Sequence, residues 1–193
     1  MKVSIIGYGV WGKKIVKTLK DIRNVEIKYI CKKNPIIGSL SEEYNFVYDY
    51  KKAINEDVDY VIICTLPKLN FEIAKFALEK KKHIFVEKPV CLNNINYDEL
   101  FLLAKKKECI MHINYIHLFN SNFKIFKNKF DQLIKGKYRA EIYLGSPMLE
   151  RKYLNLYYDW FPHIISMISS IENNFSFKIK DFKIKKNKYN KQI

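Results

Sequence analysis

Two segments of the chain carry side chains whose types and spacing suit proton transfer. Lys88 follows the predicted strand His83–Glu87 and precedes Pro89, and a proline biases the preceding residue towards an extended backbone. An extended lysine at the end of a strand can donate to a substrate oxygen, although such a lysine can also be an ordinary surface residue. Asp159 and His163 share a face if one helix carries both, and the carboxylate can then orient an imidazole that acts as a general base. The alternative for His163 is a buried histidine with a structural role.

A third segment, close to the amino terminus, suits phosphate binding. It follows the strand-like run Val3–Ile6 and leads into a helical pattern that reaches Leu19. Glycines at its first, third and sixth positions permit a tight turn, close approach of a diphosphate, and close packing of helix on strand. The helix amino terminus would hold the diphosphate, whereas the alternative is an ordinary glycine-rich turn. The predicted cofactor-binding residues here are Gly7, Tyr8, Gly9, Val10, Trp11 and Gly12.

The residues after the predicted second strand, Val25–Cys31, bear on the choice of cofactor. An enzyme selective for NAD usually has a carboxylate at this point, for the ribose hydroxyls. This chain has Lys32 and Lys33 instead, and two lysines would attract the 2′-phosphate of NADP. The alternative is a pair of solvated lysines in a lysine-rich chain. The sequence therefore predicts NADP or NAD as the cofactor, with NADP favoured.

The elements that must position these residues alternate between strand and helix. The run Val58–Thr65 is almost continuously apolar, as in a strand buried on both faces of a parallel sheet. Further strands are predicted at Phe46–Tyr48, His83–Glu87 and Cys109–Asn114, with helices between them. This alternation predicts an α/β fold with a doubly wound parallel sheet over residues 1–115. Ligands of such sheets bind beyond the carboxyl ends of the strands, which adds these cofactor-binding candidates: Thr65, Leu66, Pro67, Glu87, Lys88 and Asn114.

Residues 116–193 have a different pattern and predict the start of an α+β second domain. We expect a helix over Asn122–Ile134, a strand over Tyr138–Leu144, a helix that begins near Pro162, and a strand over Phe175–Ile184. If the helix near Pro162 begins one turn earlier, Asp159 and His163 lie on the same face.

The amino-acid composition limits the classes of protein to which the chain can belong. The chain has 193 residues, of which 48% are hydrophobic, enough for a core, and no apolar run approaches the roughly 18 residues of a membrane span. Four widely spaced cysteines without a CxxC pair indicate reduced thiols and a cytoplasmic protein, and the four histidines show no metal-binding spacing. We therefore expect no metal site.

The net charge of +15 raises the possibility of nucleic-acid binding. Only three of the 35 basic residues are arginine, the side chain best shaped for bidentate contacts with phosphate and guanine. The densest cluster is a tail with seven lysines between Lys178 and Lys191. A basic nucleic-acid-binding protein therefore remains only a minor alternative.

Taken together and in this order, these segments resemble the glucose–fructose oxidoreductase/inositol dehydrogenase family, often called Gfo/Idh/MocA. The resemblance rests on four matching pieces: Gly7–Gly12, Val58–Pro67, Glu87–Pro89 and Asp159–His163. It implies a Rossmann domain followed by an open-faced sheet domain for substrate binding and oligomerisation. It also implies NAD(P)-dependent hydride transfer at a sugar, sugar-nucleotide or cyclitol carbon. In that chemistry Lys88 would face the substrate, His163 would be the acid/base, and Asp159 would be its partner.

The chain departs from the family pattern in two ways. Asn70 stands where family members commonly have a histidine, which predicts an altered cofactor contact. Family members are also usually much longer than 193 residues, so the resemblance implies a shortened member or a fragment. Apolar strands without neighbours in the second domain lead us to expect a homodimer or a partner chain that completes the sheet. A non-catalytic, split or decayed nucleotide-binding module is the alternative to an enzyme.

Overall fold

The structure, a computed structural model, describes residues 1–34, 43–133 and 156–171. The chain divides into two compact units, Met1–Asn114 and Tyr115–Ile193, and this division lies one residue before the predicted domain boundary. The strands predicted at Tyr138–Leu144 and Phe175–Ile184 lie outside the described residues.

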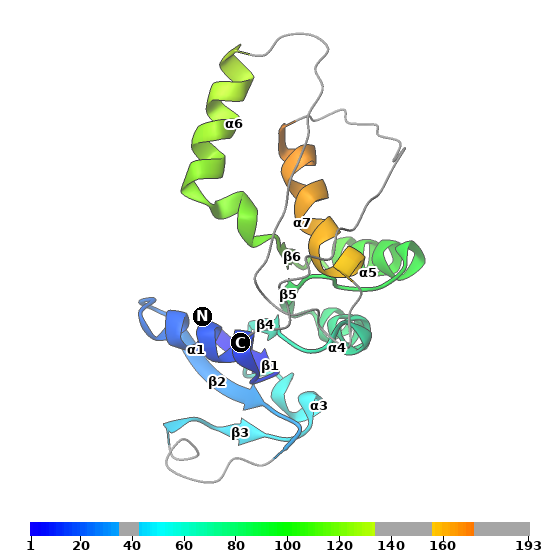
Figure 1. Ribbon diagram of the computed structural model, residues 1–193. Coiled ribbons are helices and arrows are strands. Elements are labelled where there is room, and N and C mark those ends of the chain that lie inside the picture. The colour runs from blue at the N-terminus through cyan, green and yellow to red at the C-terminus, as the bar shows by residue number, and fades with distance from the viewer. Residues whose placement is uncertain (35–42, 134–155, 172–193) are drawn as a thin grey trace, which may run out of the picture. The chain divides into compact units, whose positions relative to one another are not determined.

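The first unit is built on a six-stranded sheet in which every neighbouring pair of strands is parallel (Figure 1). The strand order is β3-β2-β1-β4-β5-β6. From β1 the sheet grows outward to β2 and β3 on one side and to β4, β5 and β6 on the other. At such a switch point between two strands, here β1 and β4, a crevice for ligands forms beyond the carboxyl ends of the strands. The strands are β1 (Lys2–Ile6), β2 (Glu26–Cys31), β3 (Phe46–Val47), β4 (Tyr60–Ile63), β5 (His83–Glu87) and β6 (Met111–Asn114).

Helices cover both faces of this sheet. Successive side chains of a strand point to opposite faces, so Ile62 of β4 packs with one cluster of buried residues and Val61 with another. The Ile62 cluster includes Val16 of α1 (Val10–Lys20). The Val61 cluster contains residues of α3 (Tyr50–Ala53), α4 (Pro67–Glu79) and α5 (Asn94–Lys106). The predicted doubly wound α/β fold is confirmed.

The helices of the first unit begin at local sequence signals. Pro67 occupies the first turn of α4, where its missing N–H costs no hydrogen bond. The side chain of Asn93 caps α5 by accepting from the backbone N–H of Asn96 at 2.8 Å. Because only three residues separate the end of β4 from the start of α4, the first turn of α4 lies at the carboxyl edge of the sheet.

The second unit contains the 3-10 turn η1 (Ile116–Phe119) and the helices α6 (Ser121–Leu133) and α7 (Leu156–Ile171). Helix α7 begins at Leu156 rather than near Pro162, and Pro162 lies inside it. Asp159 and His163 are therefore one turn apart on a single helix, the arrangement that the sequence left open. Among the described residues, no helix is long and apolar enough to cross a membrane.

Candidate functional site

The glycine loop after β1 lies between the ends of two neighbouring strands. The backbone N–H of Gly7 donates to the carbonyl oxygen of Cys31 at 2.9 Å, and that of Cys64 donates to the carbonyl oxygen of Ile6 at 2.7 Å. Gly7 has φ +101°, and a Cβ on it would lie 2.5 Å from the Cys64 carbonyl oxygen. Both the conformation and the space therefore require glycine at this position.

The other two glycines of the loop differ in what surrounds them. A Cβ on Gly12 would lie 2.0 Å from the carbonyl oxygen of Gly7, so α1 packs against the loop as closely as a bare backbone allows. Gly9 has φ −86°, and no atom of the described residues lies within 4 Å of a Cβ built on it. The loop therefore leaves an open space in front of α1 at Gly9.

The amino terminus of α1 is exposed at the open space beside Gly9. Gly9 is the N-cap, no described side chain caps the helix, and its first turn contains no acidic residue. Val10, the first residue of the helix, is 74% exposed. Accessible N–H groups and the positive end of the helix dipole suit a diphosphate. The loop and helix thus fit the diphosphate of a dinucleotide, with Gly9 giving the backbone room to approach it.

Aromatic and basic side chains surround the loop. The Tyr8 ring packs edge-on against Phe46 of β3, with ring centroids 5.4 Å apart, and burial raises the pKa of the Tyr8 phenol. The Nζ of Lys14 lies 4.8 Å from the centroid of the Trp11 ring. Lys32 directly follows β2, and its backbone N–H donates to the carbonyl oxygen of Val47 at 3.0 Å. The predicted 2′-phosphate lysine therefore stands at the carboxyl edge, beside β3.

The residues that follow β4 are joined to the end of β5 through a buried amide. Thr65 Oγ1 donates to Asn70 Oδ1 at 2.6 Å, and Asn70 Nδ2 donates to the carbonyl oxygens of Glu87 at 3.3 Å and Pro89 at 3.0 Å. Asn70 is 0% exposed, so its side chain has no surface for the cofactor contact predicted from the sequence. Leu66 is exposed and Pro67 is half-buried, so both present some surface at this edge.

Glu87 and Asn114 end the neighbouring strands β5 and β6 and are partners in register. Asn114 Nδ2 donates to Glu87 Oε1 at 2.7 Å, and Glu87 is only 8% exposed. Burial, and next the negative charge of Glu87, raise the pKa of the Cys64 thiol to about 12. Lys88 follows directly, is half-buried, and is joined to Pro89 by a cis peptide bond. The structure therefore places Lys88 beside a buried polar network at the carboxyl edge of the sheet.

The second unit surrounds His163 with aromatic rings. His163 is 6% exposed, and the ring of His117 from η1 lies edge-on to it with centroids 4.5 Å apart. The Trp160 ring lies 6.3 Å from His163, and Ser166 Oγ donates to the His163 carbonyl oxygen at 2.8 Å. Asp159 is half-buried one turn before His163. Lys88 belongs to the first unit, whereas Asp159 and His163 belong to the second.

His117 is a neighbour of His163 that the sequence did not predict. It stands far from His163 along the chain, and the spacing of the four histidines contains no signal that would pair them. The pairing depends on how η1 packs against α7, which local sequence does not specify.

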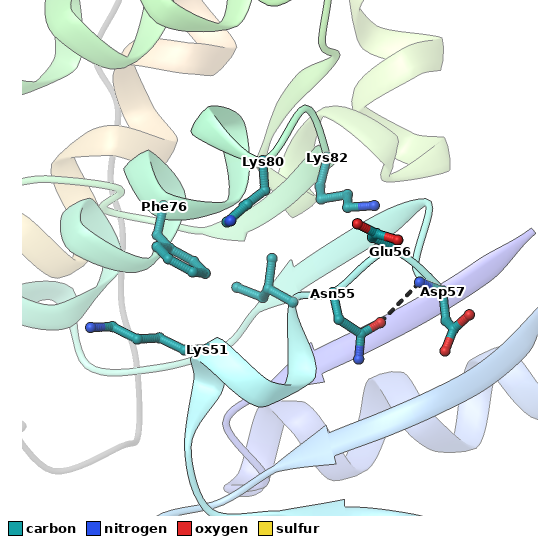
Figure 2. Close-up of a pocket in the computed structure, with 8 residues that line it drawn as sticks. Lys51, Asn55, Glu56, Asp57, Phe76, Lys80 and Lys82 are labelled. Atoms are coloured by element: carbon teal, nitrogen blue, oxygen red, sulfur yellow. Dashed lines mark hydrogen bonds between the residues drawn. The ribbon is translucent and has the colours of Figure 1, made fainter.

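A separate pocket of about 720 Å³ lies at the opposite edge of the sheet (Figure 2). It is formed by segments that precede β4 and β5, whereas the glycine loop and Lys88 follow their strands. Its charged side chains are of both signs. The lining residues are Lys51, Ile54, Asn55, Glu56, Asp57, Phe76, Lys80 and Lys82. Because it lies at the amino-terminal edge, this pocket is not part of the candidate site.

Comparisons with known proteins agree with this geometry. The uncharacterized oxidoreductase YrbE of Bacillus subtilis is 30% identical over 64% of this chain and 38% of its own length. Myo-inositol 2-dehydrogenase of Thermotoga maritima is 24% identical over 71% of this chain and 42% of its own. The chain therefore spans less than half the length of these curated relatives. The structure of scyllo-inositol dehydrogenase from Lactobacillus casei, with bound NAD(H) and scyllo-inositol, covers 68% of this chain and 41% of its own, at 19% identity with a TM-score of 0.61.

A family model described as an oxidoreductase family with an NAD-binding Rossmann fold matches residues 1–115, more than half of the chain. The predicted cofactor class, NADP or NAD, is thereby confirmed, and so is the resemblance proposed from the sequence. The glycine loop, the strand order and this match lead to one conclusion: the chain belongs to the Gfo/Idh/MocA oxidoreductase family, and residues 1–115 form its NAD-binding Rossmann fold.

Proposed function

We propose that this chain is an NAD(P)-dependent oxidoreductase that acts on a sugar, sugar-nucleotide or cyclitol carbon. The observation that carries the proposal is the open space at Gly9, in front of an α1 terminus without a side-chain cap, on the same sheet edge as Lys88. Two of the related proteins named above are dehydrogenases of cyclitols, myo-inositol and scyllo-inositol. They support the choice of polyol substrates.

The reaction separates a hydride and a proton. Oxidation of a secondary alcohol breaks a C–H bond and an O–H bond and leaves a carbonyl group. A bound nicotinamide would supply the acceptor for the hydride, which leaves with both electrons of the C–H bond. The proton of the hydroxyl group needs a base, and we assign that role to His163, with Asp159 one turn earlier as its orienting carboxylate. The reverse reaction uses the same groups in the opposite sense.

Lys88 is assigned to the substrate oxygen. Its ammonium group can donate to the hydroxyl oxygen and stabilise the negative charge that develops there as the proton leaves. Lys88 lies at the carboxyl end of β5, where ligands of open α/β sheets bind.

We propose NADP as the preferred cofactor. The chain continues from β2 into Lys32 and Lys33, without a carboxylate for the ribose hydroxyls of NAD. Lys33 is exposed and Lys32 half-buried, so both side chains have surface with which to reach a phosphate. A charge-assisted contact of this kind contributes about 1.5–3 kcal/mol.

We also propose a cytoplasmic protein that forms a homodimer or joins a partner chain through residues 116–193. All four cysteines are free thiols, as expected in a reducing compartment. In the second unit, Phe119, Ile125 and Phe126 are each more than half exposed, and exposed apolar side chains that gather on one unit favour association.

The test is hydride transfer, followed by absorbance of the reduced cofactor over a panel of sugars, sugar nucleotides and cyclitols. We expect turnover with at least one polyol, and losses of about 10²-fold or more in Lys88→Met and His163→Ala. Lys82→Met, at the opposite sheet edge, is the matched control and should keep wild-type turnover. Cofactor binding without turnover of any substrate would favour the non-catalytic module instead.

A further inference from the structure

We propose that Asn70 is a positioning residue that fixes Lys88 at the edge of the sheet. The carboxamide of Asn70 donates to the carbonyl oxygens of Glu87 and Pro89, at 3.3 and 3.0 Å. These are the residues directly before and after Lys88, so one side chain holds the backbone on both sides of it. The inference rests on the proposed function to the extent that Lys88 faces the substrate.

The orientation of the Asn70 amide is determined by its surroundings. Two carbonyl oxygens can only accept hydrogen bonds, so the nitrogen must face them, and the amide oxygen then faces the Thr65 hydroxyl, which donates at 2.6 Å. The side chain is 0% exposed, and both N–H groups and the oxygen have protein partners. A buried polar network with all its members satisfied is rigid, because each alternative position leaves a buried group unpaired.

The network joins three segments of the chain. Asn70 lies in the first turn of α4, Thr65 lies between β4 and α4, and Glu87 ends β5. The Glu87 carboxylate is held separately by Asn114 of β6. The backbone at Lys88 is thus tied to α4 and, through Glu87, to β6. A catalytic group that is misplaced by about 1 Å can lose on the order of 10²-fold in rate, so this restraint bears directly on chemistry.

Three variants test the role of Asn70. Asn70→Asp keeps the shape of the side chain and replaces its two donors by an oxygen that faces two carbonyl oxygens. Thr65→Val is a milder change that removes the hydroxyl donor and keeps the volume. Ser4→Ala is the matched control: Ser4 is also 0% exposed, and its Oγ donates to the carbonyl oxygen of Ala53 at 2.6 Å. The control removes one buried hydrogen bond of the same unit without touching the carboxyl edge.

The first measurement is amide hydrogen exchange of the full chain, read by mass spectrometry in peptides that cover residues 86–92. We expect exchange about tenfold faster in Asn70→Asp, a smaller increase in Thr65→Val, and no change in Ser4→Ala. The second measurement is hydride transfer. There kcat should fall about tenfold or more in Asn70→Asp, whereas the Kd for NADPH should stay within about twofold of wild type.

Unchanged exchange at residues 86–92 in Asn70→Asp and Thr65→Val would overturn the inference, as would an equal acceleration in Ser4→Ala. If Asn70→Asp does not fold, Thr65→Val and the control give the answer. The exchange measurement needs no substrate, so the two proposals can fail separately. Faster exchange in a chain whose wild type transfers no hydride would support the role of Asn70 in positioning Lys88 and count against the proposed function.

Discussion

Separate alanine substitutions at Gly9 and Gly12 should distinguish cofactor approach from internal packing. At Gly9 the backbone lies at φ −86° and ψ −157°, and no described atom lies within 4 Å of an added Cβ. Alanine reduces the entropy of the unfolded chain by about 0.4–1 kcal/mol but is a poorer N-cap than glycine by a similar amount, about 0.5–1 kcal/mol. The free energy of unfolding should therefore change by less than about 1 kcal/mol.

At Gly12 the same methyl group has no room. Its Cβ would lie 2.0 Å from the Gly7 carbonyl oxygen, whereas ordinary contact begins at 3.4 Å. The loop and α1 must separate by about 1.4 Å, the difference between these two distances. Overpacking typically costs about 1–3 kcal/mol, and a backbone neighbour cannot rotate away, so we expect a loss near 3 kcal/mol.

Urea unfolding of the cofactor-free protein and fluorescence titration with NADPH measure the two effects. Gly9→Ala should unfold like the wild type and bind NADPH at least about tenfold more weakly, a difference of about 1.4 kcal/mol, because its methyl group occupies space that the diphosphate needs. NADPH affinity within about twofold of wild type would refute the placement of the diphosphate at Gly9. Wild-type stability of Gly12→Ala would refute the packing argument.

Three further predictions concern cofactor choice, alkaline stability and association. The wild type should bind NADPH about tenfold or more tightly than NADH, and Lys32→Asp should shift the preference towards NADH; equal affinities in the wild type would contradict this. The pKa of Cys64 is raised from 9.0 to about 12, so the unfolded chain loses this proton first. Stability should therefore fall by up to about 1.4 kcal/mol per pH unit above pH 9, and urea unfolding at pH 8 and 10 should show a smaller fall in Cys64→Ala. Light scattering at micromolar concentration should give a mass above that of one chain, and a stable monomer would count against association through residues 116–193.

Most of the first unit could be predicted because its signals are local. The almost continuously apolar run Val58–Thr65 contains the buried strand β4, and the strand predicted at His83–Glu87 coincides with β5. The glycine loop is defined by backbone geometry that few other residues can adopt. The sequence predicts a helix that begins near Pro162, since proline favours the first turn of a helix, whereas α7 begins at Leu156. In the structure the proline is an interior residue, and α7 retains its helical course although one N–H is missing.

The arrangement at the sheet edge could not be predicted from local signals. The resemblance to the family predicts a cofactor contact at Asn70, but the side chain instead bonds to the backbone of Glu87 and Pro89, at and just after the end of β5. Likewise, only tertiary packing brings His117 to His163. Both findings depend on contacts between segments that are distant in sequence. The packing of the core, rather than the local sequence, brings these segments together.

The strand order also determines when this crevice can exist during folding. β1 is made first, yet it occupies the middle of the sheet, and its neighbour on one side is β4, where Val3 pairs with Tyr60. Until β4 joins the sheet, the carbonyl oxygen of Ile6 lacks its hydrogen bond from the Cys64 N–H. The glycine loop is then held on one side only, by the hydrogen bond between Gly7 and Cys31. Parallel pairs of this kind close long loops and form slowly. Newly made chains therefore expose a half-built sheet edge, and they become able to hold a dinucleotide only when residues far from the phosphate loop have reached their places.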